Sequence, residues 1–179
     1  MVEATRGHRR KGGWQVTRAY LLACALAWAA LLFCVQARAD TRDMLAIACG
    51  PGHGDLAPLV DREARRQFLR PVLLVAVIAR ESGCRVDADS GRGDHGLGQI
   101  RLGGSAAHGA SVEDLLKPER NIELTARHLA NCLTLCGGPT GLSVYAGHRK
   151  CKSSHYARRV LATVARIARE LARRAEGRS

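Results

Sequence analysis

Residues 71–83 read PVLLVAVIARESG, and this stretch decides what kind of fold the chain adopts. Pro71 suits the first turn of a helix, because its fixed φ matches the helix and its missing N–H is not needed there. The eight residues that follow, 72–79, are apolar all round and predict a helix that is buried on every side. A buried parallel strand gives a similar pattern, but the chain has no β-rich segment to pair with it. We therefore expect a central buried helix that ends near Glu81.

The composition predicts an all-α domain. Hydrophobic residues make up 46% of the 179 residues but aromatic residues only 4%, so the core must consist of Ala, Leu, Val and Ile. A chain of this length forms one compact domain with a segment at one end. Caps and apolar periodicity predict further helices at 41–49, 56–68, 111–117, 118–136 and 156–171. The Gly- and Asp-rich stretch 83–104 has no helical period, and we expect a long ordered loop there.

Residues 1–39 have the pattern of a secretory signal peptide. The apolar run at 19–35 is uncharged and follows five basic residues, Arg6, Arg9, Arg10, Lys11 and Arg18. A small-x-small site at 37–39 follows, so we expect a mature chain that begins at Asp40 and is exported to the periplasm or the medium. The alternative is an uncleaved membrane anchor at 19–35, because that run is borderline in length for a span.

The cysteines after this run predict disulfide bonds. There are five of them, Cys49, Cys84, Cys132, Cys136 and Cys151. Outside the cytoplasm such a set forms disulfides. The odd count leaves one thiol free or paired to another chain, and the spacing does not fix the connectivity. A zinc-ligand set is the alternative by residue type, with Cys132, Cys136, His148, Cys151 and His155. We favour disulfides because no Cys-x-x-Cys pair occurs, and we expect neither a metal nor a cofactor.

The net charge narrows the class of partner. A formal charge of +12 and a pI near 10.2 favour nucleic acid, anionic lipid or an anionic polymer. Export and the few aromatic residues available for base stacking make nucleic acid the least favoured of these. Membrane contact is expected only through the segment 19–35, if it stays uncleaved. Charge alone does not choose among these partners, and much of the basic excess lies in the signal segment.

Glu81 is the candidate catalytic residue. A carboxylate at the end of a helix meets the negative end of the helix dipole, and the apolar residues before it keep water away. Both effects raise the pKa, as a general acid near neutral pH requires. An ordinary solvated Glu at a frayed helix end is the alternative.

Six segments, taken together, carry a family resemblance. In chain order they are Glu81-Ser82-Gly83, Ser90, Gly96-Leu97-Gly98-Gln99-Ile100, Pro118 with Asn121-Ile122, Leu142-Ser143-Val144-Tyr145, and Tyr156-Ala157-Arg158-Arg159-Val160. This series resembles the soluble lytic transglycosylase family, the transglycosylase SLT domain, which is related to goose-type lysozyme. The resemblance covers residues 56–171. Together with the signal pattern, it divides the chain into a signal peptide at 1–39, an N-terminal segment at 40–55 and a catalytic domain at 56–179.

The resemblance implies an all-α, lysozyme-like fold and a peptidoglycan lytic transglycosylase with Glu81 as its single general acid/base. Such an enzyme cleaves the bond between N-acetylmuramic acid and N-acetylglucosamine in peptidoglycan glycan strands and leaves a 1,6-anhydro product. By the same match, Ser82 positions the substrate or intermediate, and Tyr145 contacts the catalytic Glu. Gly98, Gln99 and Ile100 line the sugar groove, while Tyr156 serves either the site or helix packing. The alternatives are a lysozyme-type hydrolase and a weakly catalytic wall-binding module of a secretion or appendage machine.

Four positions depart from the family pattern. Ala146 stands where Asn usually follows the matching Tyr, Thr125 stands where Gly is usual, and Arg101 and Leu102 replace the typical residues after Ile100. These changes bear on substrate preference and rate more than on the fold. Asp87, Asp89 and Asp94 are candidates for the second carboxylate of a hydrolase, although loop capping is the simpler role for such residues.

The stretch 91–96, GRGDHG, spells a dinucleotide-binding pattern. That pattern binds a nucleotide only between a strand and a helix, whereas here it follows a helix. We instead interpret its glycines as letting the loop backbone approach a sugar closely.

Overall fold

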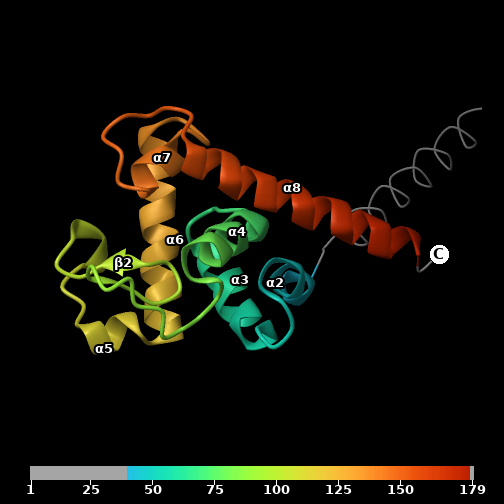
Figure 1. The fold of residues 1–179 in the computed structure, drawn as a ribbon, viewed down its shortest axis with the longest axis horizontal. Helices are drawn as coiled ribbons and strands as arrows, with labels where there is room; N and C mark the ends of the chain where they lie inside the picture. Colours follow the sequence, from blue (N-terminus) through green and yellow to red (C-terminus); the bar gives the residue numbers. More distant parts are fainter. Residues whose placement is uncertain (1–39, 178–179) are drawn as a thin grey trace, which may run out of the picture. The chain divides into compact units, whose positions relative to one another are not determined.

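Helix α4 (Pro71–Ser82) forms the centre of the fold, as its apolar sequence predicts (Figure 1). The computed structural model describes residues 40–177. All five residues from Leu74 to Ile78 are fully buried. The helix packs against α2 (Thr41–Cys49), α3 (Ala57–Arg66) and α8 (His155–Glu176). The expectation of a central buried helix in an all-α domain is therefore confirmed.

The N-terminal segment is part of the same core. The Asp40 side chain caps α2 by accepting a hydrogen bond from the Arg42 N–H, and Met44 and Leu45 of that helix are buried in the core. A short 3-10 turn, Gly54–Leu56, leads into α3, which ends at Arg66 rather than at the expected residue 68. Phe68 then adopts a positive φ in the turn before α4, and this turn ends the helix early.

The stretch 83–104 contains a small hairpin that the sequence pattern did not reveal. Strands β1 (Asp94–His95) and β2 (Ile100–Arg101) pair antiparallel, with Asp94 opposite Arg101 and His95 opposite Ile100. Two residues per strand are too few to produce an alternating pattern. The short helix α5 (Val112–Leu115) follows within the range expected for a helix, 111–117, and is capped by a box of Ser111 and Asp114.

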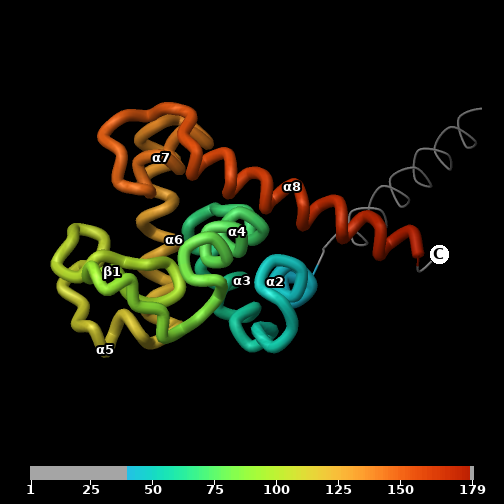
Figure 2. Tube along the Cα trace, viewed as in Figure 1, coloured from blue at the N-terminus to red at the C-terminus, as the bar shows by residue number. Residues whose placement is uncertain are grey.

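Helices α6 (Pro118–Leu135), α7 (Gly141–Tyr145) and α8 complete the domain, and their path is clear in the trace of Figure 2. Helix α6 packs against α3 and α7, and the start of α8 returns over α4. Within residues 40–177, no helix is long and apolar enough to cross a bilayer. The expected signal peptide or anchor lies outside the described residues.

Two disulfides fix the ends of these helices. Cys49 at the end of α2 joins Cys84, and Cys136 after α6 joins Cys151 before α8. Cys132 is a buried free thiol, so the prediction of two disulfides with one thiol left over is confirmed. Two of the five candidate zinc ligands are thereby occupied. The described part of the chain contains no group of three His, Cys, Asp or Glu side chains arranged for a metal.

Candidate active site

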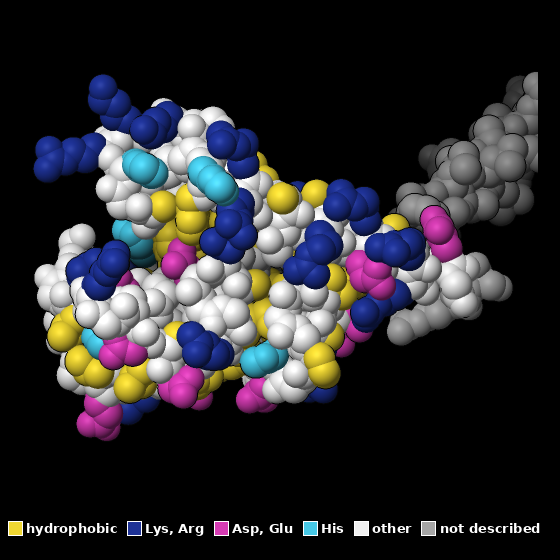
Figure 3. All heavy atoms as spheres, in the orientation of Figure 1, with side chains coloured by type: hydrophobic (Ala, Val, Ile, Leu, Met, Phe, Trp, Pro, Cys, Tyr) yellow, Lys and Arg dark blue, Asp and Glu magenta, His cyan; other side chains and the backbone are white. Residues whose placement is uncertain are grey.

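A cleft of about 620 Å³ opens on one face of the domain. Figure 3 shows that face hollowed between the part built by α7 and α8 and the part that carries the hairpin. The volume is typical of a small-ligand site. Its lining comes from α4, the hairpin, the turn at 104–106, α6, α7 and α8: Glu81, Asp94, Gln99, Ile100, Arg101, Gly104, Ser105, Ala106, His128, Val144, Tyr145, Ala146, Gly147 and Tyr156.

Glu81 lies in this cleft because α4 ends there. Gly83 adopts a left-handed conformation with φ of 61° and caps the helix, and Cys84 follows with φ of 67°. The disulfide from Cys84 to Cys49 ties this turn to the end of α2. The carboxylate therefore projects from the last turn of a buried helix, and the end of that helix is fixed by the Gly83 cap and by the Cys49–Cys84 disulfide.

The environment of Glu81 favours its protonated form. Burial raises the pKa of Glu81 and is the largest influence, and the charge of Asp94 raises it further. A hydrogen bond from Tyr156 and the charge of Arg80 lower the pKa, but less than burial raises it. The net upward shift agrees with the prediction from the sequence. Glu81 thus holds its proton to a higher pH than an ordinary Glu does.

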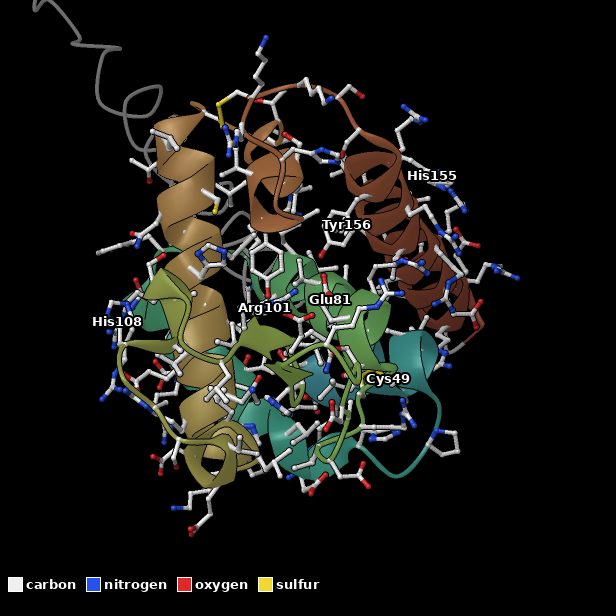
Figure 4. The ribbon with its side chains drawn as sticks, turned by 60° about the vertical axis from the view of Figure 1, so that its left-hand side comes forward. Cys49, Glu81, Arg101, His108, His155 and Tyr156 are labelled. Carbon is white, nitrogen blue, oxygen red and sulfur yellow. A yellow bond between two sulfur atoms is a disulfide. The ribbon has the colours of Figure 1, made fainter. Side chains whose placement is uncertain are left out.

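Two tyrosines meet beside Glu81. The Tyr156 hydroxyl donates a hydrogen bond to Glu81 Oε1, and Figure 4 shows the two side chains directed toward each other. The Tyr145 hydroxyl instead donates to the Gly98 carbonyl at 2.8 Å, and its ring stacks on Tyr156 with centroids 6.3 Å apart. Burial raises the pKa of both phenols, so both stay neutral donors. The family match assigned the contact with the Glu to Tyr145, whereas the contact is made by Tyr156.

The other sequence-predicted residues separate into two groups. Gln99 and Ile100 line the cleft with Glu81 and Tyr145. Ser82 and Gly98 lie behind its wall: Ser82 is buried, and its hydroxyl donates to the Ile78 carbonyl at 3.2 Å. The Gln99 amide donates to the carbonyls of Ala88 and Gly96, at 3.2 and 3.0 Å, and so braces its own loop.

Asn121 of α6 fastens the hairpin loop from behind. Its side-chain oxygen accepts from the Gly98 N–H at 2.8 Å, and its nitrogen donates to the carbonyls of His95 and Leu115 at 2.9 and 2.7 Å. Asn121 is almost completely buried. This one side chain therefore joins three segments that are separate in sequence and fixes the cleft wall.

The loop glycines allow close packing on α5 and α6. A Cβ added at Gly96 would lie 2.2 Å from the Leu115 carbonyl oxygen, and one at Gly98 would lie 1.8 Å from Thr125 Oγ1. Gly96 is thus required by protein packing. The interpretation that it lets the backbone approach a sugar is not needed.

The sequence comparison decides the family. The profile of the transglycosylase SLT domain matches residues 58–162, more than half of the chain. The chain belongs to this family. No curated protein matches it significantly. Among solved structures, an inactive Glu-to-Gln mutant of lytic transglycosylase Slt from Pseudomonas aeruginosa is similar, with a TM-score of 0.56 and 23% identity. The match covers 64% of this chain and 24% of that one, and it supports the lysozyme-like fold.

Three of the departures from the SLT pattern now have a location. Thr125 is fully buried, packs against Gly98 and donates to Asn121 Oδ1 at 3.3 Å. Ala146 is exposed and lines the cleft. Arg101 also lines it, and its guanidinium contacts Asp94 through Nε at 2.7 Å and a terminal nitrogen at 3.1 Å.

Two residues of this SLT domain were missed as site residues by sequence reasoning. Tyr156 was left open between the site and packing, and His128 was not considered. His128 lines the cleft with its ring 5.0 Å from that of Tyr145, and burial, followed by the charge of His108, lowers its pKa. A signal was present, because His128 follows Asn121 by seven residues and so shares its helix face.

Proposed function

We propose that this chain is a peptidoglycan lytic transglycosylase with Glu81 as its general acid/base. The observation that carries the proposal is a half-buried glutamate with a raised pKa, hydrogen-bonded to a tyrosine, in an open cleft of an SLT domain. The similar Slt protein is inactive as a Glu-to-Gln mutant, so one glutamate is essential in that protein. The expected substrate is the bond between N-acetylmuramic acid and N-acetylglucosamine in peptidoglycan.

The reaction proceeds in two proton transfers through one carboxyl group. Protonated Glu81 donates its proton to the glycosidic oxygen, and the bond from that oxygen to the muramyl anomeric carbon breaks. The resulting carboxylate accepts the proton of the muramyl 6-hydroxyl as its oxygen bonds to the anomeric carbon. Burial keeps Glu81 protonated before the first transfer, and the hydrogen bond from Tyr156 stabilises the carboxylate between the two transfers.

The second carboxylate in the cleft bears on the choice between lysis and hydrolysis. Glycosidases that use water pair two carboxyl groups. Among the lining residues that the structure describes, Asp94 is the other carboxylate, and it is engaged by Arg101 at 2.7 Å and by Ser90 Oγ at 3.2 Å. Asp87 and Asp89 are exposed and do not line the cleft. A carboxylate occupied in this way is poorly placed to orient water, which favours attack by the sugar's own hydroxyl.

The product tests this choice. Digestion of peptidoglycan is expected to yield muropeptides that end in 1,6-anhydro-N-acetylmuramic acid, because intramolecular attack reaches effective molarities of about 10⁵ M or more. Mass spectrometry of early digests distinguishes this product, which is lighter by one water, from the hydrolysed one. If the hydrated product dominates, the enzyme is a lysozyme-type hydrolase and Asp94→Asn is the variant to make next.

Tyr156→Phe is expected to move the alkaline limb of the pH profile of kcat/KM to higher pH. The general acid works only while it is protonated, so the rate falls as pH rises through the pKa of Glu81. The Tyr156 hydroxyl lowers that pKa, and its removal must therefore raise it. Tyr145→Phe is the matched control, because its hydroxyl bonds to Gly98 and its loss should leave the limb in place. A limb that stays or moves to lower pH in Tyr156→Phe would contradict the assignment.

We propose that the protein acts outside the cytoplasm. Two disulfides are typical of exported proteins, and peptidoglycan lies in that compartment. The second candidate function is a weakly catalytic wall-binding module, favoured by Ala146 at the cleft edge. Efficient turnover by the purified protein excludes that candidate, and binding with little or no turnover supports it.

A further inference from the structure

One part of the surface beside the cleft is strongly basic. Between Glu123 and Glu170 the sequence contains no Asp or Glu. Exposed cations gather where α7 ends and α8 begins, and Figure 3 shows Lys, Arg and His side chains over this region. We call this region the basic wall, defined by Arg149, Lys150, Lys152, Arg158 and Arg159, all of them exposed.

The basic wall is not neutralised by the protein itself. Within residues 40–177, none of its five side chains forms an ion pair. Other cations of the domain do, as Arg101 does with Asp94 and Lys117 does with Asp114. The wall therefore presents net positive charge to whatever lies against it.

The backbone that carries these charges is fixed. Ser143 is fully buried, and its hydroxyl donates to the Lys150 carbonyl at 2.8 Å and accepts from the Lys152 N–H at 3.3 Å. The Cys136–Cys151 disulfide clamps the residue between them, and the Ser154 side chain caps α8. A loop held in this way presents its charges in a set arrangement, which reduces the entropy lost on binding.

The wall adjoins the cleft at two places in the chain, before its first residue and between its two halves. Ala146 and Gly147, which precede it, line the cleft. Tyr156, which lies between its two halves, also lines the cleft and bonds to Glu81. A polymer that lies in the cleft must therefore pass beside the wall, and groups that project from the polymer come within reach of its charges.

We propose that the basic wall binds the free carboxylates of peptide stems that project from the glycan strand. This inference rests on the proposed function and names the form of substrate that the site prefers. In a stem-bearing strand, the lactyl carboxyl of each muramyl residue is consumed in an amide bond, so the strand's negative charge lies on the stems. The wall is placed beside the sugar-binding cleft and not within it, as a contact with projecting stems requires.

The test is a triple variant, R149Q/K150Q/K152Q, against a control with the same change in net charge. The control is R42Q/R65Q/R70Q, three exposed arginines that do not line the cleft. Kinetics are measured on soluble strands with free stem carboxylates and on the same strands with those carboxylates converted to methylamides. Thermal unfolding midpoints establish that both variants fold.

On carboxylate strands at low salt, the wall variant is expected to show KM raised about tenfold with kcat unchanged, since a charged wall concentrates its ligand by such factors. The difference should vanish near 1 M salt, where the Debye length is about 3 Å. It should also vanish on methylamide strands, and the control should match the wild type throughout.

Three results would overturn the inference. The first is an equal rise in KM in the control variant, and the second is an equal rise in KM of the wall variant on methylamide strands. The third is an unchanged KM of the wall variant together with lost binding to phosphatidylglycerol vesicles. The last result would assign the wall to lipid. Failure of the proposed function is separate, because it shows as no turnover by the wild type on either strand. Co-sedimentation with insoluble peptidoglycan then still tests the wall.

Discussion

Replacing Glu81 with Gln is expected to lower the rate of glycan cleavage by about 10²–10⁴-fold, the usual contribution of general acid catalysis. Gln keeps the size of the side chain and can still accept the hydrogen bond from Tyr156, but it has no acidic proton to donate. Asp94, the other carboxylate among the described lining residues, is engaged by Arg101 and cannot readily replace it. The measurement is release of soluble muropeptides per enzyme molecule.

The same substitution should not destabilise the fold. Because burial raises the pKa of Glu81 in the folded state, its ionised form costs stability at neutral pH. That cost is absent below the pKa of the unfolded chain, grows as pH rises from the unfolded to the folded pKa, and is complete above the folded pKa. Glu81→Gln should therefore be at least as stable as the wild type near pH 7, with the difference fading in acid. Glu119→Gln, at an exposed position on α6, is the control. If Glu81→Gln retained nearly the wild-type turnover, the catalytic acid would be another residue.

Asn121→Ala is expected to lower the free energy of unfolding by about 3–5 kcal/mol, because each buried polar group left unpaired costs roughly 1–3 kcal/mol. Four groups lose a hydrogen-bond partner: the Gly98 N–H, the Thr125 hydroxyl, and the carbonyls of His95 and Leu115. Cleavage should fall as well, since the loop that carries Gln99 and Ile100 is then no longer fastened to α6. Urea unfolding measures the first effect.

Asn131→Ala is the matched control for this prediction. Asn131 lies on the same helix but is exposed, and an exposed substitution of this kind changes stability by about 0.5 kcal/mol or less. If the two variants unfolded at the same urea concentration, the hydrogen bonds of Asn121 would not be holding the cleft wall together.

The sequence by itself determined the elements that depend on neighbouring residues. The apolar run before Glu81 specified a buried helix that ends near Glu81, and capping residues specified a short helix that starts near residue 111. The raised pKa of Glu81 followed from the same local pattern, because the residues just before it are those that exclude water. The number of disulfides followed from the cysteine count and the expected compartment.

Only the tertiary structure decided what depends on residues that are far apart in the chain. Tyr156 reaches Glu81 across 75 positions, and Asn121 reaches Gly98 and His95 across 23 and 26. No local pattern encodes such contacts, since they are set by how α8 crosses α4 and how α6 meets the hairpin. The same holds for the pairing of Cys49 with Cys84, and for the separation of Gln99 and Ile100 in the cleft from Ser82 and Gly98 behind it. Spacing along the sequence identified the chemical groups, and packing determined which of them meet.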